Sequence, residues 1–73
     1  MLGHRYPLGS KVRLTQQGID NVRASFGSIT GLNDVWVVTA QTYSTLFSTY
    51  TITSVMGTHY QGCKEEMIEY IGH

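Results

Sequence analysis

His59 and Cys63 are the two residues whose types could most readily do chemistry, because imidazole and thiolate groups bind transition metals and take part in nucleophilic catalysis. They stand four residues apart, a spacing that would place both on one face of a helix. A structural zinc site needs four ligands, and the other histidines, His4 and His73, lie near the ends of the chain. We therefore predict no metal site and no other cofactor, and we expect a turn histidine and a small buried thiol instead.

As a catalytic pair, Cys63 would be the nucleophile and His59 the base. Such a pair needs a third group that orients the base and a site for the oxyanion, and the sequence indicates neither. The glycines are scattered at predicted turns, and no lysine follows a G-x-x-x-x-G run, so the sequence contains no phosphate-binding loop. We predict that the protein is not an enzyme.

A second candidate site combines cations with an aromatic side chain, as nucleic-acid-binding surfaces do. The residues that could form it stand near the start of the chain: Arg5, Tyr6, Lys11 and Arg13. The whole chain has five basic and five acidic residues and a formal charge of zero, whereas domains that bind nucleic acid are usually strongly basic. We favour a solvated strand face for these cations and keep nucleic-acid binding as the alternative.

A third candidate site lies in the segment from Val35 to Cys63, which contains no Asp, Glu, Lys or Arg. Aromatic side chains gather in this segment: Trp36, Tyr43, Phe47, Tyr50 and Tyr60. A domain this small cannot easily bury them all, because each aromatic needs roughly 150–250 Å² of cover. Protein interfaces are rich in aromatic residues and poor in charge at their centres. We predict a partner-binding surface in the protruding tip of a hairpin or arm, formed by Tyr43, Leu46 and Phe47.

The elements that must position these sites are short strands. Polar and apolar residues alternate over 11–15, and strands are also predicted over 26–31, 35–39 and 49–55, with turns at 32–34 and 56–57. Residues 15–21 are too short and too interrupted by glycine for a stable helix, so we expect a helical turn capped by Thr15 or a loop. Residues 64–71 fit either a short helix or a strand, and a helical turn through Glu65 and Glu66 followed by a closing strand to Ile71 satisfies both patterns. The predicted core consists of Val12, Leu14, Ile29, Trp36, Val38, Ile52 and Ile71.

Four segments in this order carry a resemblance: Gly9–Thr15 (GSKVRLT), Gly18-Ile19, Gly27–Gly31 (GSITG) and Glu65–Ile71 (EEMIEYI). The chain resembles small SH3-like or KOW-like β-barrels, in which a G-x-x-V-x-L/V strand leads, a G-x-I/V-x-G strand follows, and a short turn with a last strand closes the barrel. Small bacteriophage proteins are similar, including the V-R-L-T-x-x-G-I opening. Residues 41–49 depart from the pattern, since the usual turn there is shorter and more polar. We expect one domain over 1–73, all-β or β with one short helical turn: a small, partly open barrel of four to five antiparallel strands.

The resemblance implies a binding module, and the composition limits where it works. A lone cysteine permits no intramolecular disulfide, no signal peptide is visible, and no stretch approaches the roughly 20 apolar residues of a membrane span, so we expect the cytoplasm, or the host cytoplasm for a phage protein. Our leading hypothesis is a protein-interaction module, such as a phage regulator that docks on a larger protein or complex; host RNA polymerase is the candidate by analogy. The alternatives are a KOW-like nucleic-acid-binding barrel in transcription or translation, and a structural protein that self-assembles through its uncharged strands.

Overall fold

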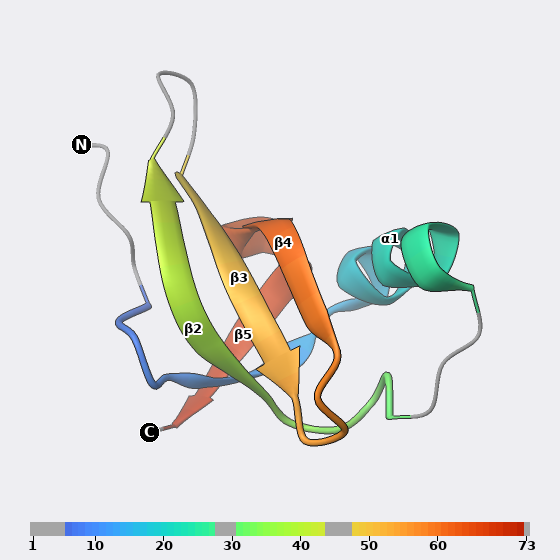
Figure 1. Ribbon diagram of the computed structural model, residues 1–73, viewed down its shortest axis with the longest axis horizontal. Helices are drawn as coiled ribbons and strands as arrows, with labels where there is room; N and C mark the ends of the chain where they lie inside the picture. Colours follow the sequence, from blue (N-terminus) through green and yellow to red (C-terminus); the bar gives the residue numbers. More distant parts are fainter. Residues whose placement is uncertain (1–5, 28–30, 44–47, 73) are drawn as a thin grey trace.

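The computed structural model describes residues 6–27, 31–43 and 48–72, with only the backbone at Tyr43. Five antiparallel strands form one open sheet of order β4-β3-β2-β1-β5, and one short helix follows the first strand (Figure 1). The elements in chain order are β1 (Lys11–Leu14), α1 (Gln16–Phe26), β2 (Trp36–Tyr43), β3 (Ser48–Ser54), β4 (His59–Lys64), the 3-10 helix η1 (Glu65–Met67) and β5 (Ile68–Gly72). The predicted fold class, a mostly β domain with a partly open, barrel-like sheet, is confirmed.

The sheet bends because three of its strand pairs contain irregularities. Between β2 and β3 the register passes from Val38↔Ile52 to Ala40↔Thr51, which leaves Thr39 as the extra residue in β2. Between β3 and β4 the register passes from Tyr50↔Cys63 to Ile52↔Tyr60, so β4 holds an extra residue there. Gly62 lies in this bulge at φ +73°, a conformation that glycine adopts at little cost. Between β1 and β5 the register passes from Lys11↔Gly72 to Val12↔Tyr70, which leaves Ile71 as the extra residue. Bulges of this kind increase the twist of a strand, and they curve the sheet around the core.

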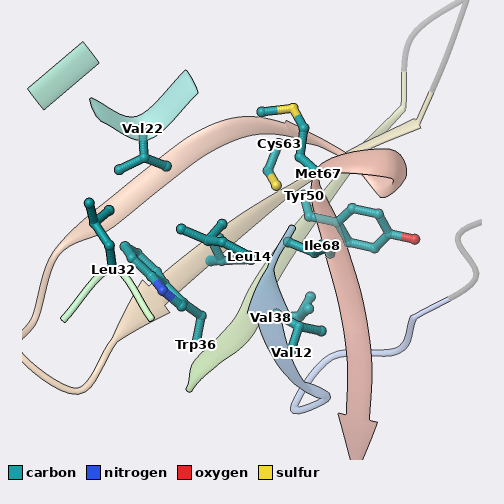
Figure 2. Packing of buried hydrophobic residues seen from close by; sticks show 11 residues of the cluster. Val12, Leu14, Val22, Leu32, Trp36, Val38, Tyr50, Cys63, Met67 and Ile68 are labelled. Carbon is teal, nitrogen blue, oxygen red and sulfur yellow. The ribbon is translucent and has the colours of Figure 1, made fainter. Parts of the chain in front are cut away.

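The core lies on the concave face of the sheet and draws on every strand (Figure 2). Its buried apolar residues are Val12, Leu14, Val22, Leu32, Trp36, Val38, Tyr50, Ile52, Cys63, Met67 and Ile68. The predictions for Val12, Leu14, Trp36, Val38 and Ile52 are therefore confirmed, and Ile29 is outside the described residues. The prediction for Ile71 is wrong: its side chain is 41% exposed, because side chains alternate along β5 from the buried Ile68, which puts Ile71 on the outward side.

Residues 16–26 form a helix, which corrects the prediction of a helical turn or loop after Thr15. Thr15 caps α1 as expected, since its Oγ1 accepts a hydrogen bond from the Gly18 amide at 3.3 Å. The buried positions Gly18 and Val22 stand one helical turn apart on the side that faces the core. Gly18 supports this packing, because a Cβ at that residue would stand only 2.1 Å from the Met67 carbonyl oxygen.

The strand predicted over 26–31 is also corrected. Phe26 is the last residue of α1, and Gly27, at φ +77°, ends the helix by donating its amide to the Arg23 carbonyl at 2.7 Å. Gly31 and Leu32 lie in the turn that leads into β2, while residues 28–30 are outside the described part of the chain. The spacing of Ile19, Val22 and Phe26 is helical, and this signal outweighs the glycines that suggested a strand.

The remaining predicted elements agree with the structure. The strands expected over 11–15, 35–39 and 49–55 correspond to β1, β2 and β3, and β2 continues to Tyr43. The helical turn through Glu65 and Glu66 is η1, and the closing strand after it is β5. The sequence did not predict β4, because the spacing of His59 and Cys63 was considered only on a helix.

Candidate functional site

His59 and Cys63 lie on strand β4, so their spacing does not bring them together. A strand rises about 3.3 Å per residue, and four residues therefore separate the two side chains by much more than hydrogen-bond distance. His59 is exposed and its Nδ1 lies 2.9 Å from Thr53 Oγ1, whereas Cys63 is buried and its Sγ donates to the Lys64 carbonyl at 3.6 Å. Among residues 6–27, 31–43 and 48–72, no three His, Cys, Asp or Glu side chains gather where they could hold a metal ion.

The surroundings of Cys63 favour an inert thiol. Burial raises its pKa to about 12, because the apolar core disfavours the thiolate. The pKa of the neighbouring Tyr60 is also raised, first by burial and second by repulsion from the negative charge of a Cys63 thiolate. A hydrogen bond with Ser25 partly offsets this rise in the Tyr60 pKa. Since the thiolate is the nucleophile in cysteine chemistry, this site is poorly suited to covalent catalysis.

The raised pKa of Cys63 makes the protein less stable in alkali. In the unfolded chain the thiol loses its proton near its usual pKa of 9.0, whereas the folded chain keeps the proton until about pH 12. The contribution of Cys63 to the free energy of unfolding is therefore complete below pH 9. It declines between pH 9 and 12, by up to about 1.4 kcal/mol per pH unit. We expect the free energy of unfolding, measured with urea between pH 9 and 12, to decline less steeply for Cys63→Ala than for the parent. Parallel pH profiles for the two proteins would contradict this assignment.

The structure separates the residues of the predicted nucleic-acid surface. Lys11 and Arg13 are exposed and alternate with the buried Val12, so they lie on the convex face of the sheet. Tyr6 packs against the core cluster on the other face, and its ring stacks on Tyr70 with centroids 5.9 Å apart. Arg5 lies outside the described residues. Glu69 stands opposite Arg13 in the β1–β5 ladder, which places an acidic residue beside the cations.

The predicted partner-binding residues fall at the end of the β2–β3 hairpin. Tyr43 is the last residue of β2 and pairs with Ser48, the first residue of β3. Leu46 and Phe47 lie outside the described residues, and so does the side chain of Tyr43. The pairing of β3 with β4 begins only at Thr49↔Lys64, so the Tyr43↔Ser48 end extends past the neighbouring strand (Figure 1).

The convex face of β2, β3 and β4 carries a chain of hydrogen-bonded hydroxyl groups instead of charges. Thr39 Oγ1 lies 3.1 Å from Thr53 Oγ1, which in turn lies 2.9 Å from His59 Nδ1. Thr39 Oγ1 also donates to the Thr51 carbonyl at 3.3 Å. The threonine hydroxyls thus form hydrogen bonds with groups on the neighbouring strands, in a segment where the sequence lacks charged residues.

Tyr6, Tyr50 and Tyr70 form an aromatic cluster that the sequence did not predict as a unit. The Tyr6 ring lies 5.7 Å from the Tyr50 ring and 5.9 Å from the Tyr70 ring, measured between centroids. Tyr50 was named among the aromatics of the uncharged segment and Tyr6 as a candidate for the nucleic-acid surface, while Tyr70 was assigned no role. The partners are 44 and 64 residues away from Tyr6 in the chain, so no local pattern could reveal the cluster.

Comparisons with known protein families, with curated proteins and with solved structures found no match. In the part of the chain that the structure describes, no helix is both long enough and apolar enough to cross a membrane. Arguments about function therefore rest on the residues themselves.

Proposed function

We propose that this protein is a non-enzymatic protein-interaction module that binds a larger protein or complex through the end of its β2–β3 hairpin. The observation that carries the proposal is the extension of this hairpin past its neighbours. Within the described residues, Tyr43 pairs with Ser48, whereas β4 pairs no further along β3 than Thr49, and the segment that leads into β1 is hydrogen-bonded to β2 no further than Gln41. An extended hairpin presents its tip to other molecules without disturbing the core.

The residue types at this end suit an interface. Thr42, Tyr43 and Ser48 are uncharged, and the tip sequence between the strands adds Leu46 and Phe47. Aromatic side chains dominate the binding energy at the centres of interfaces, where charged residues are depleted. The sequence resembles SH3-like and KOW-like barrels, which serve as binding modules, and this resemblance favours a binding role. A phage regulator that acts on host RNA polymerase is the narrower form of this proposal.

A capture experiment with matched baits tests the proposal. The parent and the double variant Tyr43→Ala/Phe47→Ala are immobilised, and bound proteins are identified at low and high salt. The control bait is Val55→Ala/Met56→Ala, because these side chains are 72% and 66% exposed at the opposite end of β3. We expect one protein to bind the parent and the control at both salt concentrations and to be lost from the Tyr43/Phe47 variant.

Two other outcomes would replace the proposal. Retention of DNA or RNA that falls steeply with salt would indicate a nucleic-acid-binding barrel using Lys11 and Arg13. Capture of the chain itself, with sedimentation that depends on concentration, would indicate self-assembly. Binding of the same protein to all three baits would show that the hairpin end is not the binding surface.

A further inference from the structure

The segment that leads into β1 is held at Tyr6 by side chains from the sheet. The Tyr6 amide donates to the Tyr50 hydroxyl at 3.2 Å, and its carbonyl accepts from Gln41 Nε2 at 2.7 Å. The Tyr6 ring is stacked on Tyr70 at an interplanar angle of 9° and tilted by 39° against Tyr50. Side chains of the sheet therefore contact the amide, the carbonyl and the ring of Tyr6.

The Tyr50 hydroxyl is oriented for this contact. It donates to Glu65 Oε2 at 2.5 Å, so its oxygen is left to accept the Tyr6 amide. A hydroxyl that donates to a carboxyl group becomes a better acceptor, and the two hydrogen bonds strengthen each other. Figure 2 shows this hydroxyl at the end of the Tyr50 ring that points away from the rest of the core cluster. The ring is fully buried with Tyr6 in place, and the hydrogen bond to Glu65 holds the hydroxyl through a contact that does not involve Tyr6.

The residues that follow Tyr6 are attached more weakly. Pro7, Leu8 and Gly9 are exposed, and the Leu8 side chain is 59% accessible. Attachment to the sheet resumes at Gly9, whose amide donates to the Val38 carbonyl at 2.9 Å. Ser10 is buried and hydrogen-bonded to the Pro7 carbonyl, and its own carbonyl accepts from the Val38 amide. Segments with few buried contacts open at a small fraction of the global unfolding free energy. Release of Tyr6 would therefore leave β1 and the core in place.

We propose that Gln41, Tyr50 and Tyr70 form a binding site for an extended peptide that presents an aromatic side chain, and that Tyr6 occupies this site as a displaceable ligand from the same chain. A few placed polar groups beside aromatic surface are the usual composition of a ligand site. Because a tethered segment acts at an effective concentration in the millimolar range, an external peptide competes poorly while Tyr6 is present. The site is separate from the Tyr43, Leu46 and Phe47 tip, so this inference goes beyond the proposed function and does not depend on it.

A titration followed by NMR tests the inference on the full chain. The probe is a synthetic peptide of residues 3–9, and the proteins are the parent, Tyr6→Ala and Leu8→Ala, all isotope-labelled. We expect Tyr6→Ala to bind the peptide at least about tenfold more tightly than the parent, with shifts at the Gln41 side-chain amide and at residue 70. Leu8→Ala keeps Tyr6 and should behave like the parent. A peptide in which alanine replaces the tyrosine should not bind.

A second measurement does not depend on Tyr6→Ala remaining folded. In the parent, the Tyr6 amide should exchange with solvent through local opening, at a rate unaffected by low denaturant. Tyr50→Phe keeps the buried ring and removes the hydroxyl, so exchange of this amide should accelerate by about tenfold. A folded Tyr6→Ala that does not bind the peptide, equal binding by the parent, or exchange of Tyr6 only through global unfolding would each overturn the inference.

Discussion

Gly18→Ala is expected to destabilise the protein strongly, although alanine is the better helix former. The gain in helix propensity is about 1 kcal/mol. The new Cβ would stand 2.1 Å from the Met67 carbonyl oxygen, which is a backbone atom and already accepts the Thr15 amide at 3.0 Å. Overpacking costs about 1–3 kcal/mol and a lost backbone hydrogen bond adds about 1 kcal/mol, so after the gain in helix propensity we expect a net loss of about 1–3 kcal/mol. For a domain of this size the melting temperature should fall by about 5 °C or more.

Gln17→Ala is the matched control, because Gln17 precedes Gly18 in the same helix and its side chain is exposed. Thermal unfolding of the two variants separates local helix preference from the tertiary contact. The control should melt at or slightly above the temperature of the parent. If Gly18→Ala also gained stability, α1 would not pack against η1 as closely as the structure shows.

Ile52→Ala is expected to remove a large part of the total stability. Ile52 is fully buried at the centre of β3, and its truncation leaves a cavity that the curved sheet cannot fill. Substitutions of this type cost about 2–5 kcal/mol, while small domains have about 5–15 kcal/mol in total. In urea unfolding we expect a much lower midpoint and an unchanged slope.

Val55→Ala provides the comparison for Ile52→Ala. Val55 follows β3 in the turn to β4, and its side chain is 72% exposed, so its truncation should change stability by no more than about 0.5 kcal/mol. Equal midpoints for the two variants would mean that the strand faces are assigned wrongly.

The alternation of polar and apolar residues predicted β1 and β3, because each of these strands buries one face and exposes the other, while the β-branched and aromatic residues over 35–39 predicted β2. Val12 and Leu14 are buried between the exposed Lys11 and Arg13, as the period of two requires. The number of short strands separated by turns also predicted a partly open, barrel-like sheet, although the strand expected over 26–31 was wrong. The alternation is local, and the sequence displays it directly.

The helix was not predicted because its stability depends on a distant contact. Gly18 weakens an isolated helix, but it lets α1 approach η1, where Thr15 Oγ1 also donates to the Glu66 carbonyl at 3.0 Å. Ile71 was misplaced because β5 begins directly after η1 with the buried Ile68, and alternation from Ile68 puts Ile71 on the outward side. Contacts between residues about 50 positions apart leave no periodic signal in the chain.

The candidate sites were predicted unevenly. Residue composition indicated an uncharged, aromatic segment and its hairpin, but it could not show that Tyr6 turns away from Lys11 and Arg13 to join Tyr70. The spacing of His59 and Cys63 suggested a shared face only under the assumption of a helix. On strand β4 the same spacing puts one residue in solvent and the other in the core.

The separation of partner binding from folding is the central claim, and paired measurements on Tyr43→Ala and Phe47→Ala test it most directly. The melting temperature and the affinity for the captured partner are determined for each variant and for the parent. We expect partner binding to weaken by about 1–3 kcal/mol, because truncated interface aromatics lose contacts at the centre of the interface. The melting temperature should change far less than it does for Ile52→Ala. A collapsed melting temperature with unchanged affinity in the remaining folded protein would contradict the claim and assign these aromatics to the core.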